Sequence, residues 1–211
     1  MGARVLKIAV FASGRGSNYE AIQKQIDTGQ INGQTVCVIS DRAKPTVFEK
    51  AAARNIPTHS INRKQFKTGD DYVEHLLKIL AGYETDLIVL AGYLKLIPAP
   101  VVKAYHHRMI NIHPALLPNF GGKGYYGMNV HRAVVEAGVN ATGITIHFVD
   151  EHYDNGNVIL QKEVKVEPDD TPEMVSEKVL KLEHKYYPEV VKLLCDNKIK
   201  IKNNKVVVEN E

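Results

Sequence analysis

The sequence contains no tryptophan and only two cysteines, and neither cysteine belongs to a metal-binding or redox-active spacing. Cys37 lies in an apolar run, and Cys195 lies in a helical pattern. These features argue against a disulfide framework and favour a reduced intracellular protein, which we expect in the cytoplasm. The chain also lacks an apolar run of membrane-spanning length, and its N-terminus has no signal-peptide pattern. We therefore expect no membrane partner.

A strong excess of charge of one sign is missing as well, because 27 basic and 24 acidic residues leave a formal net charge of +3. A value this small argues against a nucleic-acid partner and agrees with a small anionic substrate.

The last long helical pattern begins at Thr171, and Pro188 within it predicts a kink or break. Residues 198–208 then alternate lysine with aliphatic side chains and contain no aromatic residue. This pattern predicts a terminal edge hairpin guarded by lysines rather than a nucleic-acid surface.

Apolar strands alternate with helical segments along the 211 residues, which is typical of an α/β protein. We predict one domain over 1–211, built as an open, mostly parallel twisted sheet with helices on both faces, Rossmann-like. A first half, 1–110, would bind phosphate, and a second half, 111–211, would carry catalysis. Ligands bind such sheets at the carboxyl ends of the strands, so we expect three loops on one rim: 13–18, 92–97 and 113–120.

A glycine-rich turn joins the first predicted strand to the first helix. Gly14, Gly16, Ser17 and Asn18 would place backbone N–H groups at a helix N-terminus, an arrangement that binds phosphate. The turn lacks the third glycine of a dinucleotide fingerprint and the lysine of a P-loop, so it matches neither of these nucleotide-binding motifs. The alternative is a plain helix cap with flexible glycines.

The segment 109–120, MINIHPALLPNF, places two polar side chains at the end of a predicted strand. Alternation along a strand puts Asn111 and His113 on the same face. An amide can donate a hydrogen bond to a developing oxyanion, and an imidazole exchanges a proton near neutral pH. For an isolated pair, a turn-capping asparagine and a packed surface histidine are the simpler explanation.

An acid-rich loop, 150–156, follows the strand predicted at 142–149. A carboxylate such as Asp154 beside His113 would raise the pKa of the imidazole and hold its orientation. A plain Asp-Asn-Gly turn accounts for the same residues. We interpret His147, inside the strand, as a structural histidine, and we expect no metal because the sequence shows no ligand cluster.

Two further loops adjoin these segments. Residues 92–97 present an apolar surface with one lysine, which suits a flat organic ligand or, more simply, a helix start. Residues 121–127 contain four glycines, so they form either a lid or an exposed turn.

Together these stretches resemble the folate-dependent formyltransferase family, and within it the branch that acts on glycinamide ribonucleotide. The resemblance covers nearly the whole chain, and the motifs follow the family's order: SGRGSN at 13–18, LAGYLKLI at 90–97, NIHPALLP at 111–118, HFVDEHYDNG at 147–156 and LEHKYYP at 182–188. The NIHP segment with a downstream acid loop is typical of folate formyltransferases, and the glycine turn narrows the resemblance to the ribonucleotide branch.

The resemblance implies transfer of the formyl group of 10-formyltetrahydrofolate, a co-substrate, to the amine of glycinamide ribonucleotide in purine synthesis, without a metal. It implies that Gly16, Ser17 and Asn18 hold the phosphate and that Glu183 lies near the sugar. Asn111, His113 and Asp154 correspond to the catalytic trio, with Asn111 and a protonated His113 donating to the formyl oxygen. The folate pocket corresponds to Leu94, Lys95, Leu96, Ile97, Asn111, Asp150, Glu151, Tyr153 and Asp154.

The sequence departs from the family at Gly69, where many members carry an arginine near the folate's glutamate tail, and Lys64 or Lys67 are the candidates to replace it. The loop 121–127 is longer than in the commonest members.

Three alternatives stay open: a formyltetrahydrofolate hydrolase, a methionyl-tRNA formyltransferase and a non-catalytic phosphate-binding α/β module. The first two are disfavoured because we expect an additional domain in each. Both a monomer and a homodimer agree with the sequence.

Overall fold

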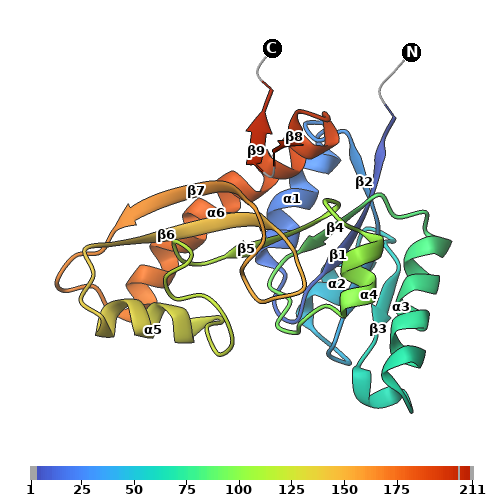
Figure 1. The fold of residues 1–211 in the computed structure, drawn as a ribbon, viewed down its shortest axis with the longest axis horizontal. Helices are drawn as coiled ribbons and strands as arrows, with labels where there is room; N and C mark the ends of the chain where they lie inside the picture. Colours follow the sequence, from blue (N-terminus) through green and yellow to red (C-terminus); the bar gives the residue numbers. More distant parts are fainter. Residues whose placement is uncertain (1–3, 204, 210–211) are drawn as a thin grey trace.

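The computed structural model describes residues 4–203 and 205–209. A seven-stranded sheet forms its centre, as can be followed in Figure 1. The strand order is β3-β2-β1-β4-β5-β6-β7. Strand pairing is parallel from β3 to β5 and antiparallel from β5 to β7, so the predicted mostly parallel sheet is confirmed. The strands are β1 (Leu6–Phe11), β2 (Gly33–Ser40), β3 (Thr58–Ser60), β4 (Leu87–Leu90), β5 (Met109–His113), β6 (Ala141–Phe148) and β7 (Val158–Lys165).

Helices cover both faces of the sheet, as the sequence predicts. Alternation along β1 sends Ile8 and Val10 into one apolar cluster and Ala9 and Phe11 into the other. The first cluster packs against α1 (Ser17–Asp27), α2 (Thr46–Ala52), α5 (Met128–Glu136) and α6 (Pro172–Cys195). The second packs against α3 (Gly69–Gly82) and α4 (Ala99–Ala104), and a short 3₁₀ turn, η1 (Arg63–Gln65), precedes α3.

The long helix α6 is anchored to the centre of the sheet through a buried tyrosine. The Tyr187 hydroxyl donates to the Leu90 carbonyl at 2.9 Å and lies 3.3 Å from the Ile110 carbonyl. These carbonyls belong to β4 and β5, so α6 is fixed beside the strand ends that carry the predicted site. Pro188 follows this tyrosine inside α6, which continues to Cys195, so of the predicted kink or break the break is wrong.

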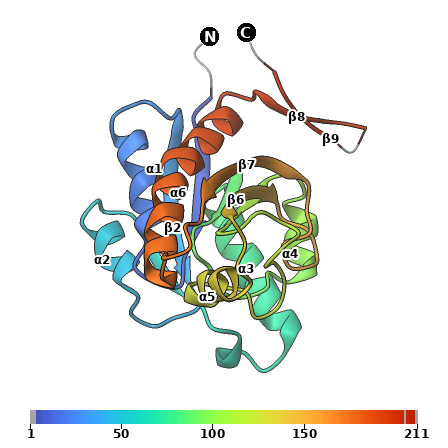
Figure 2. The same ribbon diagram turned by 90° about the vertical axis from the view of Figure 1, so that its left-hand side faces the viewer.

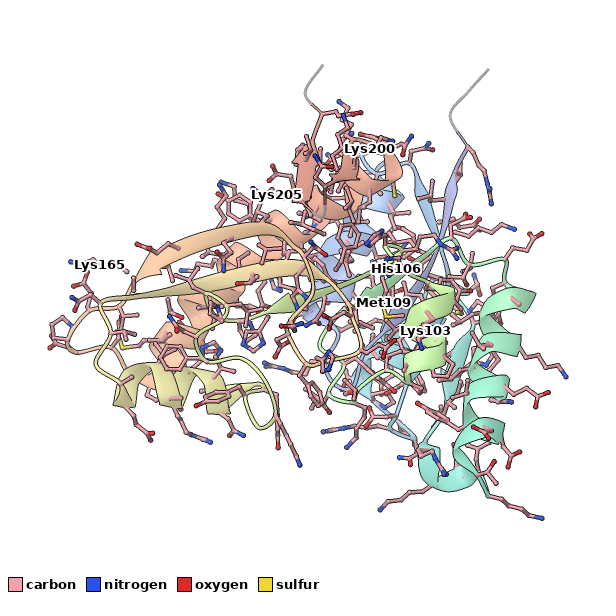
Figure 3. The ribbon with its side chains drawn as sticks, viewed as in Figure 1. Lys103, His106, Met109, Lys165, Lys200 and Lys205 are labelled. Atoms are coloured by element: carbon pink, nitrogen blue, oxygen red, sulfur yellow. The ribbon has the colours of Figure 1, made fainter. Side chains whose placement is uncertain are left out.

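The predicted terminal hairpin is present, but it does not extend the main sheet. β8 (Ile199–Lys202) and β9 (Lys205–Val208) form a separate two-stranded sheet that lies beyond the end of α6 (Figure 2). Figure 3 shows Lys200 and Lys205 on this hairpin. Residues 92–97 are not a helix start either, because α4 begins only after Pro98.

Candidate active site

A cavity of about 480 Å³ opens at the carboxyl ends of β1, β4 and β5. The turn 14–18, the segment 90–97 and the end of β5 all contribute to its wall, so three predicted rim loops do share one site. Parts of the loops 122–127 and 152–154 complete the wall together with α6, which contributes Glu183.

The turn before α1 is shaped by Gly16, the residue that caps the helix. Its φ of 70° is left-handed, and a Cβ there would lie 2.5 Å from Val47 Cγ2, so only glycine fits. No side chain makes a capping hydrogen bond at the start of this helix. The first-turn N–H groups have no partners within the helix and are available to an anion.

The amide of Asn18 reaches across to α6. Its Nδ2 donates to Glu183 Oε2 at 2.7 Å, so the predicted phosphate-binding turn and the predicted sugar-binding acid contact each other directly. Burial raises the pKa of Glu183 to about 6, and the hydrogen bond from Asn18 offsets part of that rise.

A buried serine links the glycine-rich turn 13–18 to the segment 92–97. The Ser13 hydroxyl donates to Asp41 Oδ1 at 2.5 Å and accepts the Leu94 N–H at 3.0 Å. The Ser13 N–H also donates to the Gly92 carbonyl at 3.0 Å. These bonds hold the segment in an open, non-helical conformation along the cavity wall.

Asn111, His113 and Asp154 converge at the centre of the cavity, although Asp154 lies far from the other two in sequence. His113 Nδ1 is 3.5 Å from Asp154 Oδ2, and Asn111 Nδ2 is 3.4 Å from Asp154 Oδ1. The Gly122 N–H donates to Asp154 Oδ2 at 2.9 Å and fixes the carboxylate from the loop side. His113 is only 4% exposed, so water screens these charges weakly.

The expected rise in the pKa of His113 is wrong. Burial lowers the pKa of His113 below its usual value, and the neighbouring Asp154 carboxylate offsets this effect only in part. His113 Nε2 lies 2.7 Å from the Phe120 carbonyl, which can only accept, so the proton of the neutral ring sits on Nε2. The Nδ1 lone pair therefore faces the cavity and Asp154. Burial raises the pKa of Asp154, but His147 and His113 in their protonated forms, together with the Gly122 N–H, outweigh it, and the net pKa is lowered.

The formyl transferase family model matches residues 6–191 of this chain. The chain belongs to the formyl transferase family. A phosphoribosylglycinamide formyltransferase from Bacillus subtilis is 38% identical over 89% of this chain and 94% of its own length. The chloroplastic enzyme of that name from Arabidopsis thaliana is 42% identical over 97% of this chain and 71% of its own. Among solved structures, glycinamide ribonucleotide transformylase 1 from Symbiobacterium toebii has a TM-score of 0.90 at 33% identity, covering 98% of this chain and 95% of its own.

This member of the family holds a further histidine in the site, and our interpretation of it as purely structural missed its contacts. His147 Nε2 lies 3.2 Å from Asn111 Nδ2 and 3.7 Å from Asp154 Oδ1. His147 and Asn111 are direct cross-strand partners in the antiparallel pair of β5 and β6. Strand alternation combined with this register is the signal that would have found it.

His131 on α5 also lines the cavity and was absent from our predictions. Burial lowers its pKa to about 4, and its Nδ1 has no hydrogen-bond partner among the described residues.

Leu94, Lys95, Leu96 and Ile97 line the cavity, as do Tyr153 and Asp154. Asp150 and Glu151 are not among the lining residues. The Asp150 carboxylate accepts from the His152 N–H at 2.9 Å and from Asn155 Nδ2 at 2.8 Å, so it shapes the acid loop. Glu151 lies 3.4 Å from Lys103 on α4, which Figure 3 labels.

A second cavity of about 470 Å³ adjoins the first and shares Tyr93, Lys95 and Leu96 with it. Arg63 lines this second cavity, and its Nη2 lies 3.9 Å from where a Cβ on Gly69 would stand. The cation beside Gly69 is therefore an arginine from η1.

The described residues contain no group of three or more His, Cys, Asp or Glu arranged to hold a metal ion. Within the same ranges, no helix has the length and apolar character needed to cross a membrane.

Proposed function

We propose that this protein transfers the formyl group of 10-formyltetrahydrofolate to the amine of glycinamide ribonucleotide in purine synthesis. The observation that carries the proposal is the convergence of Asn111, His113 and Asp154 in a cavity that also contains a helix N-terminus suited to phosphate. The names of the relatives from Bacillus subtilis and Arabidopsis thaliana support the same reaction.

The ribonucleotide would bind between α1 and α6. Its phosphate would accept hydrogen bonds from the backbone N–H groups of Gly16, Ser17 and Asn18 at the start of α1. The Glu183 carboxylate, held by Asn18 at 2.7 Å, would accept the sugar hydroxyls. This division places the anionic end of the substrate at the positive end of the helix.

The folate would lie along the segment 94–97. Leu94 and Leu96 are 36% and 44% exposed and offer apolar contact to a flat ring system, and Tyr153 of the acid loop lines the same cavity. The anionic glutamate tail would extend toward the second cavity, where Arg63 and Lys95 supply positive charge. In this arrangement Arg63, rather than Lys64 or Lys67, compensates for Gly69.

The geometry indicates how the trio would act. The neutral amine attacks the formyl carbon, and an Asn111 N–H donates to the oxygen on which negative charge builds. The Nδ1 lone pair of neutral His113 accepts the proton that the amine loses, and the Asp154 carboxylate stabilises the imidazolium that forms. The proton then passes, through water, to the folate nitrogen as the bond from the formyl carbon to that nitrogen breaks. His113 thus acts first as a base.

A formyl-transfer assay tests the proposal by following tetrahydrofolate release with and without glycinamide ribonucleotide. Release that requires the ribonucleotide supports the transferase, whereas release in water alone identifies a hydrolase. With a folded protein, no release in either mixture would favour a non-catalytic phosphate-binding module.

Replacing His113 with alanine should lower kcat by roughly 10²–10⁴-fold, the usual contribution of an acid–base group. His59→Ala is the matched control, because His59 bonds Tyr83 at 2.9 Å and does not line the cavity. If His113→Ala retains wild-type kcat, His113 is not the acid–base group.

Three further expectations belong to this proposal. The halves 1–110 and 111–211 would divide phosphate binding from catalysis, and the protein would act as a monomer or homodimer without nucleic acid. The cytoplasmic location stays a prediction, and the plant relative is named as chloroplastic.

A further inference from the structure

The tautomer of His147 follows from the contact of its Nδ1, because its Nε2 lies near both Asn111 Nδ2 and, farther away at 3.7 Å, Asp154 Oδ1. His147 Nδ1 lies 2.8 Å from the Phe148 carbonyl, which can only accept, so Nδ1 carries the proton. In the neutral ring Nε2 is then left with a lone pair. Asn111 Nδ2 lies 3.2 Å from this Nε2. Of these two nitrogen atoms only Nδ2 carries hydrogen, so the Asn111 amide donates to His147.

This bond determines which way the Asn111 amide points. The amide nitrogen has two hydrogens, and one of them is held by His147. The other faces Asp154 Oδ1 at 3.4 Å, a longer distance at which a hydrogen bond is weak. If the amide were rotated by 180°, its oxygen would face the Nε2 lone pair and the Asp154 carboxylate, and neither acceptor would receive a hydrogen bond from Asn111.

We propose that His147 is a positioning residue that anchors one Asn111 N–H and thereby leaves the other free to donate to the formyl oxygen. The inference rests on the proposed formyl transfer and assigns a task to a side chain outside the catalytic trio. His147 is 2% exposed, so solvent competes weakly for its Nε2 and the orientation persists before the substrate arrives.

The arrangement also explains why the long contact to Asp154 is useful. A donor that is already well bonded would have to break that bond when negative charge develops on the substrate. The second N–H of Asn111 has only the 3.4 Å contact to give up, while the 3.2 Å contact to His147 stays in place. The amide therefore reaches the transition state without reorientation.

The test is a double-mutant cycle in the complete chain. His147→Leu removes the acceptor and should lower kcat about tenfold to a hundredfold, because a misplaced catalytic group costs about that much, with little change in the ribonucleotide KM. His147→Gln keeps an oxygen acceptor within reach of Asn111 and should recover most of that loss. His59→Leu, a strand histidine bonded to Tyr83 away from the cavity, is the control.

The cycle is completed with Asn111→Ala. If His147 acts through Asn111, adding His147→Leu to Asn111→Ala should lower kcat by less than about twofold further. Independent, multiplicative losses would overturn the proposal, and so would a Gln variant as slow as the Leu variant. A purely structural role predicts both of these contrary results.

A measurement on the wild-type protein keeps the test valid if His147→Leu does not fold or if the protein lacks formyl transfer. In ¹⁵N-labelled protein, imidazole shifts should show His147 protonated on Nδ1, with a scalar coupling between Nε2 and the Asn111 amide. Protonation on Nε2 would overturn the proposal whatever the activity. If the expected tautomer is found but the protein transfers no formyl group, the proposed reaction is refuted, and the catalytic task given to His147 is refuted with it. The hydrogen bond between Asn111 and His147 would still be established by that result.

Discussion

Gly156 ends the acid loop at a point where no side chain fits. A Cβ at this position would lie 1.8 Å from the Phe148 carbonyl oxygen. A carbon and a carbonyl oxygen approach no closer than about 3.3 Å, so Gly156→Ala must push the two segments apart by about 1.5 Å. The same Phe148 carbonyl accepts from His147 Nδ1, and the Phe148 N–H donates to the Asn157 carbonyl at 2.9 Å.

The cost can be estimated from these contacts. Overpacking of a tight site costs about 1–3 kcal/mol, and one weakened hydrogen bond adds about 1 kcal/mol. We therefore expect Gly156→Ala to lose about 2–4 kcal/mol of unfolding free energy. With a urea m-value of about 2 kcal/mol/M, the midpoint should fall by about 1–2 M. Because the shift also moves Asp154 and His147, kcat should fall by about 10²-fold.

Gly82→Ala is the matched control, because at the end of α3 no atom beyond its chain neighbours and its own helix backbone lies within 4 Å of its Cβ position. This change should leave kcat unchanged and leave stability equal or higher by up to about 1 kcal/mol. Urea unfolding by circular dichroism and the formyl-transfer assay measure both effects. A Gly156→Ala protein within about 0.5 kcal/mol of wild type, with wild-type kcat, would refute the steric argument.

Three other changes test separate parts of the structure. Gly16→Ala places a Cβ against Val47 and forces alanine into a backbone φ of 70°, so the turn must distort. The ribonucleotide KM should rise at least about tenfold while the folate KM stays unchanged. Equal changes in both KM values would contradict the phosphate-binding role proposed for this turn. Glu183→Gln should stabilise the protein at pH 8 by about 2 kcal/mol, because the folded pKa of about 6 lies above the ordinary 4.5 and the charged carboxylate opposes folding above pH 6. This gain should vanish below pH 4.5 in urea titrations; a gain that persists there has another cause. Thr145→Val removes a hydroxyl that donates to the Ala115 carbonyl at 2.7 Å and accepts a hydrogen bond from the Leu117 N–H at 3.0 Å. The free energy of unfolding should therefore fall by about 2–4 kcal/mol. A loss smaller than about 1 kcal/mol would mean that water replaces the hydroxyl.

The elements of the fold follow from patterns that are local in the sequence. The run VLKIAVFA predicts β1 because its apolar residues are consecutive, and the glycine turn after it predicts the helix N-terminus at α1. The predicted positions of the rim loops are confirmed for the same reason, because parallel strands place their carboxyl ends together. Local patterns also identify Asn111 and His113 as neighbours on one face of β5.

Tertiary contacts decided how those residues are used. Asn18 contacts Glu183, 165 positions away, and no local pattern predicts that pair. The pKa of His113 depends on how deeply β5 is buried, and the expectation of a raised pKa failed because it considered the Asp154 charge without the cost of desolvation.

The sequence by itself determined the alternation of strands and helices and the residue types at the rim, because these depend on period and turn chemistry within a few positions. Only the tertiary structure decided that His147 contacts Asn111 and that the Phe120 carbonyl holds His113 Nε2. It also decided that Asp154 contacts both His113 and Asn111. Strand register and loop closure set those distances, and both arise from packing among residues that are remote along the chain.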